Sequence, residues 1–122
     1  MKPEVKRQGR VQEFETSERC SILEVANDTG DEQVSIARAK VKPGTTTAWH
    51  KLNGITERYI IIAGKGRVQI GDSQPLDVHE GDVVRIPADT AQRIENMGEE
   101  DLVFYAVCSP RFRQKSYVSL ES

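Results

Sequence analysis

The fold prediction starts from residues 44–66, GTTTAWHKLNGITERYIIIAGKG. This stretch contains two consecutive segments with the residue alternation of a β-strand. Alternate side chains of an extended strand share one face of a sheet. His50 and Leu52 therefore point one way on the first segment, and Glu57 and Tyr59 share a face on the second. The stretch predicts two strands that each turn a polar group and an apolar group to the same side.

Asn53-Gly54 stands between these two segments and is a strong signal for a β-hairpin, since both residues tolerate positive φ. A hairpin at this position would bring the His50 imidazole and the Glu57 carboxylate together. The alternative is an ordinary half-buried histidine and a solvated strand glutamate. The pair alone leaves both interpretations open.

The rest of the chain repeats this pattern of short strands and turns. Residues 33–42, QVSIARAKVK, alternate apolar or small residues with longer ones before Pro43-Gly44, and further strands are expected at 21–26 and 102–108. No window has the period of an amphipathic helix. Many short strands with glycine and proline turns predict an all-β sandwich or barrel.

A second segment, GDVVRIPADTAQRIEN at residues 81–96, completes two sequence motifs that resemble those of the cupin family. The first motif is a glycine, five residues, H-x-H, three or four residues, a glutamate, six residues and a glycine. The second is a glycine, five residues, P-x-G, two residues, a histidine, three residues and an asparagine. The matching positions in this chain are Gly44, His50, Glu57, Gly64, Gly81, Pro87 and Asn96.

Three motif positions depart from the pattern. Leu52 stands where the second histidine is expected, Asp89 replaces a glycine, and Gln92 replaces the last histidine. The resemblance implies a double-stranded β-helix, the jelly-roll form of barrel. It also implies a single cupin domain over residues 1–122, with a core barrel at 33–108, an N-terminal strand arm at 1–32 and a C-terminal tail at 109–122.

The resemblance and the strand parity together define a candidate site inside the barrel. The side chains expected to face inward are His50, Leu52, Glu57, Tyr59, Gln92 and Ile94. Cupins with the full motif hold a divalent metal with three imidazoles and one carboxylate. By that resemblance His50, Glu57 and Gln92 are the candidate metal ligands, for Zn, Mn, Fe or Ni. An amide oxygen is a poorer ligand than imidazole and Leu52 donates nothing, so weaker metal binding is expected.

Three functions follow from this site. The first is binding of a small oxygenated molecule, with or without the metal, at His50, Glu57 and Gln92. The second is a metal-dependent enzyme of the dioxygenase or isomerase type, and without metal Glu57 and Tyr59 are the candidate catalytic residues, as general base and donor. The third is a non-catalytic structural or sensor module, which Leu52 keeps open. The sequence does not decide whether the protein is an enzyme.

Composition and charge argue against several other classes of function. The chain has 17 Lys and Arg residues against 19 Asp and Glu residues and no long block of one sign, which argues against nucleic acid or an anionic membrane as the main partner. The N-terminus has no apolar core for a secretory signal, and the longest apolar run, Tyr59–Ala63, is too short to span a bilayer. We therefore expect a soluble cytoplasmic protein.

Four further expectations concern single segments. Residues 1–10 are polar and are expected to be a loosely held arm. Residues 12–26 are expected to pair with a second subunit in a homodimer, as the resemblance implies. Arg111, Arg113 and Lys115 indicate a solvated or inter-subunit segment. His79 is expected in an exposed loop, and Cys20 and Cys108 as buried unpaired thiols.

Overall fold

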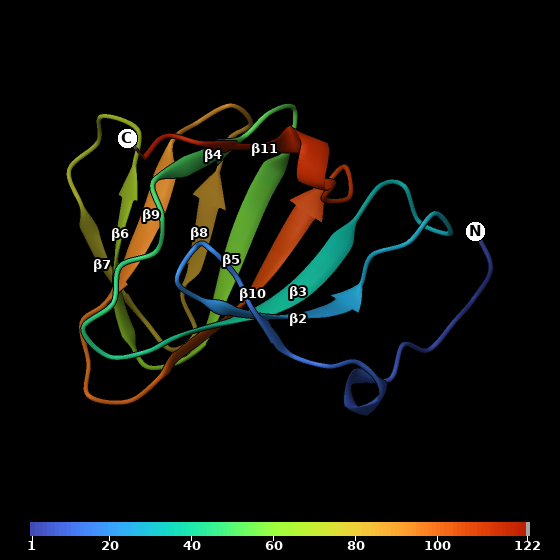
Figure 1. The fold of residues 1–122 in the computed structure, drawn as a ribbon, viewed down its shortest axis with the longest axis horizontal. Coiled ribbons are helices and arrows are strands. Elements are labelled where there is room, and N and C mark those ends of the chain that lie inside the picture. The colour runs from blue at the N-terminus through green and yellow to red at the C-terminus, as the bar shows by residue number, and fades with distance from the viewer. Residues whose placement is uncertain (122) are drawn as a thin grey trace.

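The computed structural model of the protein describes residues 1–121 and consists of two antiparallel β-sheets packed face to face (Figure 1). The strands are β1 (Phe14–Glu15), β2 (Ser21–Ala26), β3 (Ser35–Val41), β4 (His50–Leu52), β5 (Thr56–Ala63), β6 (Lys65–Ile70), β7 (Leu76–His79), β8 (Val83–Ile86), β9 (Gln92–Asn96), β10 (Leu102–Ser109) and β11 (Tyr117–Ser119). Two 3₁₀ turns, η1 (Gln8–Arg10) and η2 (Gln114–Ser116), are the only helical elements in the described part of the chain. The predicted all-β jelly roll is confirmed.

One sheet has the order β1-β2-β3-β10-β5-β8 and the other has the order β11-β4-β9-β6-β7. The chain changes sheet between β4 and β5 and again between β5 and β6. The predicted hairpin at Asn53-Gly54 is therefore wrong, since β4 pairs with β9 and β11 while β5 pairs with β10 and β8. A turn with positive φ can join two strands of opposite sheets as well as two neighbours in one sheet, and the local sequence does not distinguish these cases.

The turn at Gly54 is fixed by a residue from the second motif. Gly54 has φ +72° and its backbone N–H donates to Asp89 Oδ1 at 2.9 Å. The Asp89 backbone N–H in turn donates to the Leu52 carbonyl at 3.1 Å. Asp89 itself has φ +65°, a conformation that aspartate adopts more readily than most residues. Asp89 thus occupies the glycine position of the motif while its side chain holds the crossing between the sheets.

The core lies between the two sheets and is formed by alternate residues of the strands. Its buried apolar residues are Cys20, Ala39, Val41, Tyr59, Ile61, Val68, Val84, Ile86, Ile94, Leu102 and Phe104. All six side chains predicted to face inward are buried, including the polar His50, Glu57 and Gln92. A glycine is required at Gly64, because it has φ +91° and a Cβ there would lie 2.8 Å from the Asp101 carbonyl oxygen.

The two ends of the chain meet the barrel in different ways. Residues 1–10 are exposed, and β1 forms the outer edge of the six-stranded sheet. The C-terminal segment adds β11 to the second sheet beside β4, a strand that the sequence prediction treated as part of the tail. Arg111 and Arg113 both pair with Glu32, at 3.2 and 2.6 Å.

The remaining single-residue expectations are settled by the same fold. His79 is exposed as predicted, although it is the last residue of β7 and does not lie in a loop. Cys20 and Cys108 are both buried free thiols. No helix among residues 1–121 combines the length and apolar character that crossing a membrane requires.

Candidate functional site

The fold places the three predicted metal ligands on three strands of the barrel. His50 on β4 is paired with Gln92 on β9, within one sheet. Glu57 on β5 is paired with Cys108 on β10, within the other sheet. The imidazole and the carboxylate thus face each other across the barrel from opposite sheets.

His50 and Glu57 line a cavity of about 230 Å³. The cavity is bounded by strands β1 to β5 and β10, by the loop before β2, and by η2 with β11. Its apolar lining comes from Phe14, Ile22, Ile36, Ala37, Leu52, Ala106 and Phe112. Gln92 and Tyr59 do not line it, so these two predicted site residues lie behind its wall.

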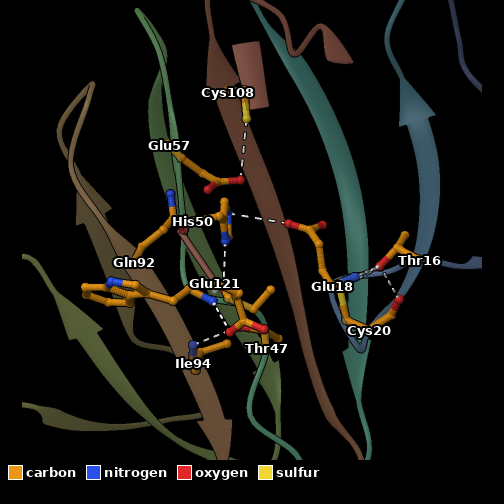
Figure 2. Close-up of polar contacts among 12 residues, drawn as sticks. Thr16, Glu18, Cys20, Thr47, His50, Glu57, Gln92, Ile94, Cys108 and Glu121 are labelled. Atoms are coloured by element: carbon orange, nitrogen blue, oxygen red, sulfur yellow. Dashed lines mark hydrogen bonds and ion pairs between the residues drawn. The ribbon is translucent and has the colours of Figure 1, made fainter. Parts of the chain in front are cut away.

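The orientation of His50 is set by its own backbone. Nδ1 lies 2.8 Å from the Ala48 carbonyl oxygen, and since a carbonyl oxygen only accepts, Nδ1 carries the hydrogen and donates it. Nε2 then points the other way and lies 3.5 Å from Glu18 Oε1 (Figure 2). In the neutral ring Nε2 holds the free lone pair, so it can accept a proton, a hydrogen bond or a metal ion.

Glu57 is the most deeply buried acidic side chain of the site. The Cys108 thiol donates to its Oε2 at 3.5 Å, while Oε1 is buried and accepts no hydrogen bond. Burial raises the pKa of Glu57 above its ordinary value, and the opposing influences of His50, Gln92 and Cys108 are smaller. A buried carboxylate oxygen without a donor is costly, so a bound group that donates to Oε1 would be favoured.

Gln92 and Tyr59 form a buried polar pair next to Glu57. The Tyr59 hydroxyl donates to Gln92 Oε1, and the Tyr59 ring packs on Phe104 with centroids 4.3 Å apart. With its oxygen occupied, Gln92 turns its amide nitrogen toward Glu57 (Figure 2). Burial raises the pKa of Tyr59 well above its ordinary value. Neither residue is among those that line the cavity.

Two residues that the sequence interpretation missed complete the site. Glu18, in the loop before β2, is largely buried, and this burial raises the pKa of its carboxyl group against the smaller effects of His50 and Tyr117. Tyr117 on β11 stacks on His50, with centroids 4.9 Å apart and planes 19° apart. Burial, together with Glu18, raises the pKa of Tyr117 to about 12. The short alternation of Tyr117–Ser119 could have indicated a strand, but nothing in the loop sequence marks Glu18.

The donor set does not match a closed transition-metal site. Among residues 1–121 no group of three or more His, Cys, Asp or Glu side chains has the arrangement to hold a metal ion. Leu52 supplies no donor, and Gln92 presents a nitrogen that cannot coordinate. The remaining donor atoms are His50 Nε2, which lies 3.5 Å from Glu18 Oε1, and Glu57 Oε1, which accepts no hydrogen bond. The residues present therefore fit a polar pocket better than they fit the metal cage of the full motif.

The comparisons with known proteins agree with this architecture. The profile of the cupin domain family matches residues 37–108, and the chain belongs to this family. The uncharacterised protein MJ1618 of Methanocaldococcus jannaschii is 32% identical over 87 residues, which are 71% of this chain and 69% of that protein. An oxalate-binding protein of Thermotoga maritima is 37% identical over 71 residues, 58% of each chain.

A solved structure shows the same fold over most of this chain. The crystal structure of a predicted oxalate decarboxylase from Thermotoga maritima superposes with a TM-score of 0.77 and 24% identity. The superposition covers 88% of this chain and 99% of that one. This likeness shows that the two chains share the same fold.

Proposed function

We propose that this protein binds a small oxygenated molecule in its barrel cavity, with His50 and Glu57 as the direct polar contacts and Gln92 as the residue that positions Glu57. The observation that carries the proposal is Glu57 Oε1, a buried carboxylate oxygen that accepts no hydrogen bond. A buried polar atom without a partner costs about 1–3 kcal/mol, and a ligand hydroxyl that donates to it recovers part of this cost. The relative named as oxalate-binding supports a small ligand of this general kind.

The surroundings of His50 support the same proposal. The Ala48 carbonyl fixes Nδ1, so that Nε2, beside Glu18, is the nitrogen a ligand can contact, and Tyr117 covers one face of the ring. A few polar groups on a mostly apolar wall are typical of small-molecule sites. A cavity of about 230 Å³ is smaller than most drug-sized pockets, so the ligand is a compound of a few carbon atoms.

The same pair of groups can move protons on a bound molecule. Burial raises the pKa of Glu57, and a carboxylate of raised pKa is a stronger general base. His50 Nε2 can give or take a second proton. The binding function does not require this chemistry, and turnover of a bound compound is a separate measurement.

The test is a thermal-shift screen of the purified protein with polyols, hydroxycarbonyl compounds, hydroxy acids and dicarboxylates, followed by calorimetric titration of any that bind. Each compound is tested with excess chelator and again with added Zn²⁺ or Mn²⁺. We expect binding by wild type and its loss in His50→Ala and Glu57→Gln. The matched controls are His79→Ala and Glu80→Gln, which change exposed residues outside the cavity.

Equal binding by His50→Ala, Glu57→Gln and wild type would overturn the proposal, because the ligand would then lie elsewhere. Binding of every compound only in the presence of added metal would favour the metal-dependent reading of the site. A complete absence of shifts in wild type would favour a structural module.

A further inference from the structure

We infer that the ligand of this cavity is uncharged, a neutral hydroxylated or amide compound, and that the chelated protein discriminates against the carboxylate of the same size. This inference rests on the proposed function and names its ligand class. The ligand would then differ in charge from that of the relative named as oxalate-binding, since oxalate is an anion.

The ionisable groups around the cavity are mainly acidic. None of the described residues that line it is a lysine or an arginine, whereas three are glutamates, Glu18, Glu24 and Glu57. His50 is the one possible cation of the lining, and its Nε2 already lies 3.5 Å from Glu18 Oε1, so a ligand carboxylate would have to compete with Glu18 for it. Like charges within a few ångström repel strongly where water is excluded.

Three arginines that are next in sequence to lining residues are bound to other groups. Arg19 pairs with both carboxylate oxygens of Glu121, at 3.0 and 3.1 Å. Arg58 donates to Ser109 Oγ at 3.1 Å, and Arg111 donates to Asn27 Oδ1 at 3.1 Å. None of the three is free to turn inward without losing these contacts.

The two carboxyl groups nearest His50 are hydrogen-bond acceptors when they are charged. Glu57 Oε1 has no donor, and Glu18 offers a second carboxylate beside His50 Nε2. A carboxylate ligand brings only acceptor oxygens, but a hydroxyl or an amide brings N–H or O–H donors. A ligand that satisfies Glu18 and Glu57 therefore brings donors.

The pKa values of both glutamates show that a negative charge is unfavourable in this cavity. Burial raises the pKa of Glu18 and that of Glu57, in each case as the largest influence. A further anion would raise that cost, while a neutral donor would lower it by hydrogen bonding to the charged forms.

The experiment compares pairs of compounds that have the same shape and differ in charge. The pairs are glycolamide with glycolate, glyceramide with glycerate, and oxamide with oxalate. Affinities are measured by calorimetry or ligand-observed NMR at neutral pH with excess chelator. We expect the amide of at least one pair to bind about tenfold or more tighter than its acid, a ratio equivalent to about 1.4 kcal/mol.

A variant shows whether the discrimination comes from the acidic lining. Glu18→Gln removes one negative charge of the lining and should narrow the difference between acid and amide, while Glu80→Gln on the exposed surface should not. Stronger or equal binding of the acid in chelated wild type would overturn the inference and leave the proposed function standing. If neither member of any pair binds, the inference fails together with the proposed function.

Discussion

Tyr117 lies flat on His50, although the two residues are 67 positions apart in the sequence, and their ring centroids are 4.9 Å apart. The contact exists because β11 pairs with β4, with Ser119 opposite His50. It makes the C-terminal strand one wall of the cavity. What holds this strand in place therefore controls the shape of the site.

Arg19 and Glu121 fasten the C-terminal strand to the loop that carries Glu18. Glu121 binds the Arg19 guanidinium and also accepts from the Trp49 backbone N–H at 3.0 Å. We predict that Arg19→Ala increases amide hydrogen exchange at residues 117–119. Arg67→Ala, which breaks a comparable exposed pair with Asp77, is the control and should leave exchange there unchanged. Unaltered protection of residues 117–119 in Arg19→Ala would show that backbone pairing alone holds the strand.

The ion pair between Arg19 and Glu121 should persist over a defined pH range. Arg19 and the Trp49 N–H lower the pKa of Glu121 from 4.5 to about 2. A lowered folded pKa gives a stabilising contribution that is present above the unfolded value and is lost as pH falls through the folded one. The exchange protection of β11 should therefore persist at pH 4 and weaken toward about pH 2.

Glu57→Gln is expected to stabilise the protein at alkaline pH. The folded pKa of Glu57 is raised, so its contribution to stability is fully present below the unfolded value and is lost as pH rises through the folded pKa. The neutral amide of the variant avoids that loss. We expect a gain of about 1–3 kcal/mol in the free energy of unfolding, because a buried unsatisfied polar group costs that much. Denaturant unfolding at several pH values measures this difference in stability between the variant and wild type. The advantage over wild type should vanish below pH 4.5, and a variant less stable than wild type at alkaline pH would contradict the account.

Restoring the family's histidines should restore metal affinity. Gln92→His and Leu52→His each place an imidazole at a position that the full cupin motif uses, so the double variant should bind Zn²⁺, Mn²⁺ or Fe²⁺ more tightly than wild type. Glu57→Ala should bind more weakly than wild type, since it removes a carboxylate from the site. Calorimetric titration of the apo proteins checks both. Equal and negligible binding in all variants would mean that these positions do not converge on one point.

Much of this structure could be predicted from residue alternation and motif spacing. The strands at 21–26 and 35–41 and the inward side of His50, Glu57 and Gln92 follow from a period of two, which depends on local sequence alone. The sheet to which each strand belongs does not follow from the local sequence. For that reason the hairpin predicted at Asn53-Gly54 is wrong. Glu18 and Tyr117 reach the site through pairings between distant segments, and no local pattern records such pairings.

A homodimer stays a prediction, and the edge of the six-stranded sheet is where we place it. β1 is the outermost strand of this sheet and its Phe14 side chain is 49% exposed. An uncovered edge with an apolar side chain is suited to pairing with a second copy. Sedimentation at micromolar concentration should show a dimer that Phe14→Glu weakens. A monomer in wild type would contradict this expectation.

The central claim is that a ligand reaches the buried Glu57 carboxylate, and the most direct measurement follows that group itself. Carbon-detected NMR of protein labelled at the glutamate side-chain carboxyls reports the Glu57 signal during titration with a bound neutral compound such as glyceramide. The account predicts a saturable shift of the Glu57 signal that is stronger than the shift at exposed Glu80. Saturation of binding with an unchanged Glu57 signal would contradict it.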